Sequence, residues 1–222
     1  MTGDVYISGI YQVGELGDKL GVRTKWRGEE WYPASFILPA SSDYAYSNIK
    51  LAAQGRKLDR DQFPECEAVW NEQAFAKARD FLWLSGFLTV KQKVADVLSR
   101  FDLGGGELVP VPLYKDDLET PWPEPHYYIN YGGPKDTFVP EESPDAKFQY
   151  NNPKTGLDVY EVPFGFKDNG VALNATSLRG ADIWFEVKID SKLFLSGALV
   201  DALLAAKIDV DLRLKACRIV EG

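Results

Sequence analysis

One pattern occurs twice in this chain: a short apolar run that ends at a hydroxyl residue, an amphipathic helical segment, and a second apolar run. The first copy begins at Phe87-Leu88-Thr89 and the second at Phe194-Leu195-Ser196. The copies lie further apart than the roughly 20 to 50 residues that separate the repeats of a solenoid. The pattern therefore predicts two related strand–helix–strand units, at residues 87–114 and 194–221, inside one small protein.

Each predicted helix carries apolar residues at the spacing of one helical face. These residues are Val94, Val97, Leu98 and Phe101 in the first copy and Leu199, Leu203 and Ala206 in the second. Thr89 and Ser196 stand at the predicted N-cap positions, where a side-chain oxygen accepts a backbone N–H that the first helical turn leaves free. Closing strands are expected at residues 108–111 and 212–219. Together the units predict an α+β fold with a mixed or mainly antiparallel sheet.

The part before the repeats predicts a less regular lobe at residues 1–80, followed by a repeat-containing domain at residues 81–222. Short strands are expected at residues 5–7 and 35–38, between glycines and prolines. Trp70, Ala74, Ala78 and Phe81 recur at about one helical turn and predict a helix over residues 67–84. The alternative is that residues 81–84 open a strand, since Gly86 interrupts the pattern before the first repeat.

The chain is acidic, with a net charge of −8 and a pI near 4.8. Such a charge disfavours nucleic acid and anionic membranes as partners and favours a basic protein surface. No run approaches the ~20 apolar residues that span a bilayer, and the first residues do not form a signal peptide, so a cytoplasmic location is expected. Cys66 and Cys217 lack CxxC spacing, which favours two reduced thiols over a disulfide.

Two acidic segments that contain prolines, residues 115–125 and 139–145, lie between the repeats. Proline excludes a helix interior or a central strand, so exposed loops are expected. The candidate partner-binding side chains on and beside these loops are Asp116, Asp117, Glu119, Trp122, Glu124, Tyr127 or Tyr128, Glu141 and Glu142. Carboxylates can steer a basic partner and aromatic side chains can anchor it. The alternative is a solvated loop whose aromatic residues fold back onto the core.

Motifs for catalysis are weak. His126 is the single histidine, so a histidine-rich zinc site is excluded, and its position among prolines predicts a surface residue. The Gly104-Gly105-Gly106 run follows a predicted helix, whereas a phosphate loop precedes one, so we interpret it as helix termination. Adjacent acids such as Asp116-Asp117 could serve glycoside hydrolysis, but acids in proline-rich loops are usually there for solubility. We expect a protein that is not an enzyme and uses no cofactor or metal.

Several segments resemble the Imm11 immunity-protein family, also known as the domain of unknown function DUF1629. The resemblance covers roughly residues 80–220 and is carried by residues 89–112 and 127–139, Asp182-Ile183-Trp184-Phe185, Leu193-Phe194-Leu195-Ser196 and Asp201-Ala202-Leu203. Family members frequently have an acidic residue and Arg after the serine, whereas Ser196 is followed by Gly197-Ala198. The resemblance implies an immunity protein, which binds a cognate bacterial toxin and blocks its active site or substrate path.

A carbohydrate-binding module is the alternative function. Trp26, Trp31 and Tyr32 lie close together among glycines and charged residues. Aromatic faces beside acids are suited to stacking on sugar rings. Protection of the protein from heat by a sugar would favour this function, and affinity for a toxin domain would favour immunity.

Overall fold

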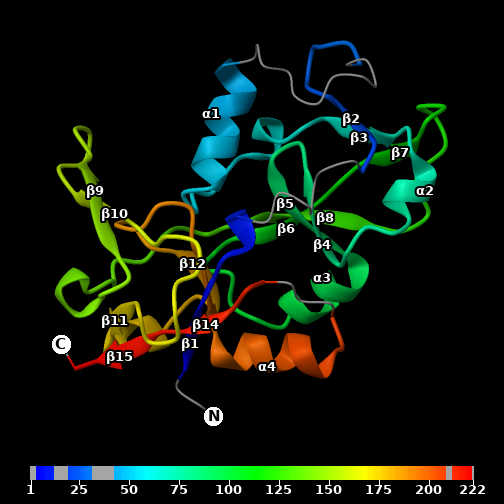
Figure 1. The fold of residues 1–222 in the computed structure, drawn as a ribbon. Helices are drawn as coiled ribbons and strands as arrows, with labels where there is room; N and C mark the ends of the chain where they lie inside the picture. Colours follow the sequence, from blue (N-terminus) through cyan, green and yellow to red (C-terminus); the bar gives the residue numbers. More distant parts are fainter. Residues whose placement is uncertain (1–3, 13–19, 32–42, 209–211, 222) are drawn as a thin grey trace.

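The computed structural model describes residues 4–12, 20–31, 43–208 and 212–221. In these ranges the chain has the predicted α+β fold, with four α helices and several mostly antiparallel sheets (Figure 1). The α helices are α1 (Asp43–Ala52), α2 (Glu72–Phe75), α3 (Gln92–Leu98) and α4 (Gly197–Ala205). The first eight strands are β1 (Val5–Ser8), β2 (Val22–Lys25), β3 (Cys66–Val69), β4 (Phe81–Leu84), β5 (Phe87–Lys91), β6 (Glu107–Pro110), β7 (Leu113–Lys115) and β8 (His126–Asn130). The others are β9 (Lys147–Asn151), β10 (Asp158–Glu161), β11 (Ala172–Asn174), β12 (Ile183–Phe185), β13 (Leu193–Ser196), β14 (Lys215–Ala216) and β15 (Arg218–Val220).

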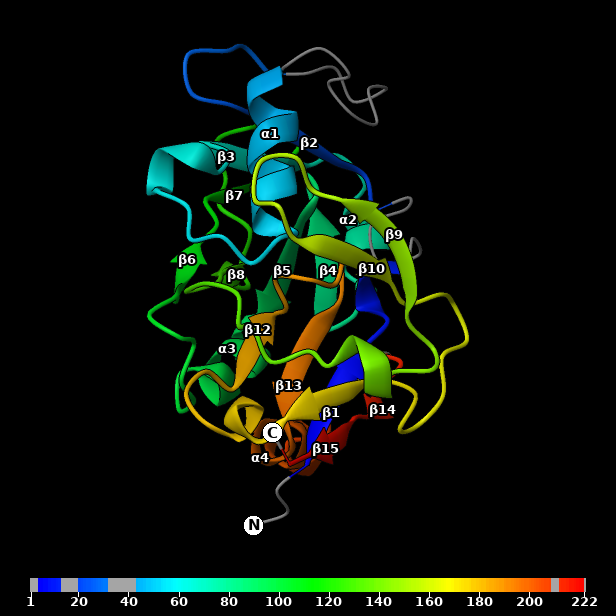
Figure 2. The same ribbon diagram turned by 90° about the vertical axis from the view of Figure 1, so that its left-hand side faces the viewer.

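Two four-stranded sheets share one topology, and they contain the two predicted units. Their strand orders are β4-β5-β8-β6 and β12-β13-β1-β14. In each, an antiparallel hairpin leads into a helix, and the strand after the helix joins the sheet two places away, separated from the hairpin by one antiparallel strand. The helices α3 and α4 of the two units pack against each other, as Figures 1 and 2 show.

The two helices begin differently. Ser196 caps α4, because its Oγ accepts the backbone N–H of Leu199 at 3.2 Å, as the sequence predicts. The prediction for Thr89 is wrong: the N-cap of α3 is Lys91, without a side-chain bond. The reason is that β5 continues to Lys91, which pairs with His126 of β8. When the two units are compared by their N-caps, Lys91 therefore matches Ser196. The hydroxyl residues suggest a different match, Thr89 with Ser196, which is shifted by two residues.

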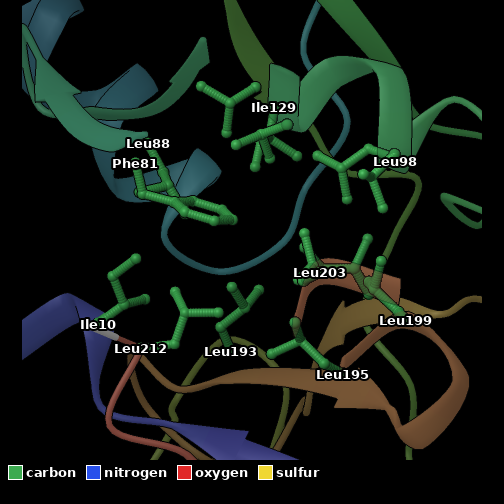
Figure 3. Packing of buried hydrophobic residues seen from close by; sticks show 14 of the residues in the cluster. Ile10, Phe81, Leu88, Leu98, Ile129, Leu193, Leu195, Leu199, Leu203 and Leu212 are labelled. Atoms are coloured by element: carbon green, nitrogen blue, oxygen red, sulfur yellow. The ribbon is translucent and has the colours of Figure 1, made fainter. Parts of the chain in front are cut away.

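The main core lies between the two units. The predicted inner faces of α3 and α4 are buried there, and Figure 3 shows Leu98, Leu199 and Leu203 facing one another. Phe101 and Ala206 are half-buried at positions after the helix ends. Each fully buried side chain of this kind contributes about 1.5 to 3 kcal/mol, so this interface is a principal source of stability.

The predicted helix over residues 67–84 is wrong, because the segment forms β3, the single-turn α2 and β4. β3 hydrogen-bonds to β2 on one side and to β7 on the other. Asn71 then caps α2 by accepting the N–H of Ala74 at 3.1 Å. The apolar spacing that suggests one helix belongs to three elements, and the alternative strand at residues 81–84 is confirmed.

The other strand predictions have different outcomes. The strands at residues 5–7 and 108–111 are present as β1 and β6, whereas residues 35–38 lie outside the described residues. The single closing strand at residues 212–219 is wrong, because β14 pairs with β1 and β15 pairs in parallel with β11. The chain changes sheets at Cys217, whose N–H bonds to Val5.

A second core joins the β2-β3-β7 sheet and α1 to the β4-β5-β8-β6 sheet. It combines Trp26, Phe63, Phe75, Leu82, Phe87 and Tyr128 with smaller apolar residues. These residues come from both sides of position 80. The division of the chain into two domains at that position stays a prediction. Both cysteines are free, as expected, and Cys217 is buried. None of the helices in the described ranges has the length and apolar character needed to cross a membrane.

Candidate functional site

An acidic and aromatic surface lies where β3 and β7 end. The two strands run parallel with Val69 opposite Lys115, so Trp70 and Asp116, the next residues of each, emerge side by side. Trp70 is 42% exposed, which is unusual for so large an apolar side chain. We call this area the β3–β7 surface and define it by Trp70, Glu72, Asp116, Asp117, Glu119 and Trp122.

The carboxylates of this surface differ in what they bind. Asp116 accepts a 2.6 Å bond from Arg23, which also donates to the backbone oxygen of Asp116. Asp117 holds the following turn, because its carboxylate accepts from the hydroxyl and N–H of Thr120 and from the N–H of Glu119. These bonds, the Thr120 hydroxyl first, hold the pKa of Asp117 below its usual range, so it remains charged. Glu119 is exposed and forms no ion pair within the described part of the chain.

The predicted aromatic anchors are less accessible than Trp70. Trp122 is half-buried, and its ring meets Phe75 edge-on at 5.0 Å. Tyr128 is fully buried. Tyr127 is half-buried and donates its hydroxyl to Gln92 at 2.7 Å. The alternative of aromatic residues folded back onto the core thus applies to Tyr128, and in part to Trp122 and Tyr127.

The remaining predicted acids lie elsewhere. Glu124 pairs with Lys91 at 3.5 Å, beside the start of α3. Glu141 and Glu142 lie on a short 3-10 helix (Pro140–Glu142), and Glu142 pairs with Arg218 at 2.7 Å. β15, which contains Arg218, and β7 lie on opposite sides of the molecule (Figure 1). The structure therefore brings Asp116, Asp117, Glu119 and Trp122 together and places Glu141 and Glu142 far from them.

The structure also corrects the predictions for His126 and for the glycine run at residues 104–106. His126 is 1% exposed instead of lying on the surface, because it begins β8 and packs against Phe75. Its Nδ1 donates to the Glu124 carbonyl at 2.8 Å, and burial lowers its pKa.

The glycine run does not terminate a helix, since α3 ends at Leu98. Gly104 instead forms part of the turn into β6, where its carbonyl packs so closely on Gly132 that a Cβ there would lie 1.9 Å away.

Two prominent residues of the structure, Trp70 and Glu67, are not predictable as such from the sequence. The apolar spacing places Trp70 in a predicted helix, whereas in the structure it follows β3, which pairs in parallel with β7, and is 42% exposed. Glu67 is fully buried on β3, and its carboxyl oxygens lie within hydrogen-bond distance of the hydroxyls of Thr24, Ser85 and Tyr128, at 2.9, 2.6 and 2.8 Å. Burial raises its pKa to about 7. No local signal predicts this, because a lone Glu in a strand ordinarily faces water.

The carbohydrate platform lacks its first member. Trp26 is 3% exposed and packs against Phe87 and Tyr44, so it offers no face to a sugar ring. Trp31 is half-buried, and Tyr32 lies outside the described residues. Among the residues that the structure describes, three or more His, Cys, Asp and Glu side chains do not come together as a metal site would require.

Comparison with known proteins leaves the family open. No protein-family model and no curated protein matches the chain. Membership of the Imm11 family therefore rests on the sequence resemblance alone and is a proposal.

Proposed function

We propose that this protein is an immunity protein, which neutralises a cognate bacterial toxin by binding it directly in the cytoplasm. The observation that carries the proposal is the β3–β7 surface, where an exposed tryptophan stands beside carboxylates on a scaffold of paired strands. The resemblance to the Imm11 family supports the same function.

The chemistry of this surface suits a basic protein partner. Tryptophan is the residue type most enriched among side chains that dominate binding energy, and Trp70 is already half-exposed. Asp117 and Glu119 add charge beside it, and the net charge of −8 extends the attraction to longer range. Ion pairing of Asp116 with Arg23 orders the surface before binding, which reduces the entropy lost on association.

The proposed mechanism is occlusion. A stable complex buries about 800 Å² on each partner, enough to cover an active site or the path of a substrate. An acidic surface competes most directly for a toxin surface that binds phosphates, so a nuclease or another nucleotide-directed toxin fits best. The inhibition requires no catalytic group and no cofactor in this chain.

The first test is co-expression with the C-terminal domain of the protein encoded by the neighbouring gene. Cell survival and co-purification of a complex are the expected results. Survival without a complex, or a complex without survival, would contradict neutralisation by direct binding.

Matched variants then locate the interface. Trp70→Ala is expected to weaken the complex by about 2 kcal/mol or more, whereas Phe148→Ala, which truncates an exposed aromatic residue on β9, should leave its Kd unchanged. Glu119→Gln should slow association at low salt, whereas Glu141→Gln, the same charge change far from this surface, should not. Equal effects within each pair, measured by surface plasmon resonance, would remove the β3–β7 surface from the interface.

A further inference from the structure

The buried carboxylate of Glu67 joins two sheets. Thr24 lies on β2 and Glu67 on β3, whereas Ser85 lies in the β4–β5 turn and Tyr128 on β8. The cluster therefore connects the β2-β3-β7 sheet to the β4-β5-β8-β6 sheet. Thr24 and Ser85 also contact each other through their hydroxyl oxygens.

Counting hydrogens shows that the cluster is one proton short when Glu67 is ionised. Four oxygen–oxygen contacts link the four groups: three involve the carboxylate, and the fourth joins Thr24 to Ser85. Each hydroxyl owns a single hydrogen, so three hydroxyls can satisfy three contacts. With a carboxylate, one contact must place two lone pairs against each other. A proton on Glu67 completes the set: Glu67 donates to Thr24, Thr24 to Ser85, and Ser85 and Tyr128 donate to the other carboxyl oxygen.

Glu186 provides an internal contrast. This second buried glutamate accepts from the N–H groups of Thr137, Phe138 and Trp184 and from the Thr137 hydroxyl. Each of these four contacts has its own hydrogen, and an N–H group cannot accept. Burial raises the pKa of Glu186 as well, but the hydrogen bonds of its site are complete when the carboxylate is ionised, whereas those of the Glu67 site are complete when Glu67 is protonated.

We propose that Glu67 is a proton-dependent latch, which carries a proton while the two sheets are docked and loosens their contact when it ionises. Among the described residues, Tyr128 faces the carboxyl of Glu67, and the Cys66 thiol and the Arg60 guanidinium lie near enough to act on Tyr128. The Lys25–Glu65 pair lies beside Cys66 at the ends of β2 and β3. The rise of the Glu67 pKa has burial as its main cause, and hydrogen bonds from Ser85, Tyr128 and Thr24 oppose it.

The latch lies under the β3–β7 surface. Trp70 follows β3 directly, and Arg23, which holds Asp116, is the neighbour of Thr24 on β2. Ionisation of Glu67 would therefore also disturb that surface. This consequence rests on the proposed function, but the latch itself is a property of the free protein and can be tested without a toxin.

The proton is measured directly by nuclear magnetic resonance on the wild-type protein labelled with ¹³C at the glutamate carboxyl carbons. Burial raises the pKa of both Glu67 and Glu186, so both should titrate above the exposed glutamates, and the resonance of Glu67 should titrate near pH 7. It should be absent from Glu67→Gln and present in Glu186→Gln. If every glutamate of the wild-type protein titrates at the ordinary value, the proposal is overturned, whether or not the variants fold.

The loosening is measured by hydrogen exchange of β2 and β3, comparing the wild type with Glu67→Gln at equal pH. At about pH 8.5 the wild-type strands should exchange on the order of a hundredfold or more faster than those of the variant, and at about pH 4, below the unfolded-state pKa of 4.5, the two should agree. The ratio of the exchange rates of the wild type and Glu186→Gln should not change with pH in this way. A ratio of wild type to Glu67→Gln that is the same at both pH values would refute the latch.

Discussion

Truncation of Leu203 tests the central interface. Leu203 is 1% exposed on α4 and faces α3 in the main core, whereas its neighbour Leu204 is 59% exposed on the same helix. Leu203→Ala removes three buried carbon atoms, which costs about 2.4 kcal/mol at 0.8 kcal/mol per methylene. The cavity that remains between the helices raises the expected loss to between about 2.5 and 5 kcal/mol. Leu204→Ala should stay within about 0.5 kcal/mol of the wild type.

The assay is guanidinium unfolding followed by tryptophan fluorescence. The midpoint should fall in Leu203→Ala with an unchanged slope, because the surface exposed on unfolding is the same. For a chain of 222 residues the melting temperature should fall by roughly 5 to 20 °C. If Leu203→Ala and Leu204→Ala have equal stability, the packing of α4 against α3 is not the main core and the assignment of two docked units fails.

Two further predictions concern single interactions. Ser196→Ala should cost about 1 kcal/mol of stability in the same assay because it removes the cap of α4, whereas Thr89→Ala should not weaken α3 through a lost cap, since Lys91 occupies that position. A larger loss of helix signal in circular dichroism for Thr89→Ala would contradict this assignment. The folded-state pKa of Glu67 is raised from 4.5 to about 7, so the stability that it contributes is fully present below pH 4.5 and is lost as pH rises to about 7, in total about 3 kcal/mol. Glu67→Gln should remove this fall from denaturation measured across that range, and an unchanged pH slope would exclude it.

The local sequence pattern was sufficient to predict the elements that bury one face against a neighbouring element. The helical spacing of Leu199 and Leu203, the cap at Ser196 and the apolar run at residues 193–195 all act within a few residues of one another. Their interactions were therefore predictable from the sequence. Thr89 failed as a cap because strand pairing with β8, distant in sequence, extended β5 by two residues.

The candidate site was predictable only in part. Proline and acid in residues 115–125 predicted an exposed loop, and Asp116, Asp117 and Glu119 lie on one. Trp70 lies beside them because β3 and β7 pair in parallel although they are distant in sequence, whereas Glu142 lies elsewhere and pairs with Arg218 of β15. Neither contact can be predicted from the residues that are close to it in sequence.

Periodicity and charge are properties of neighbouring residues, so the α+β class, the two strand–helix–strand units, their apolar faces and the acidic character of the chain follow from the sequence. The division of residues 67–84 among three elements, the burial of His126 and the place of Glu67 among hydroxyls between two sheets became apparent only in the folded protein. These outcomes depend on contacts between distant segments. Such contacts can override local propensity, because pairing on both edges of β3 satisfies its backbone hydrogen bonds without a helix.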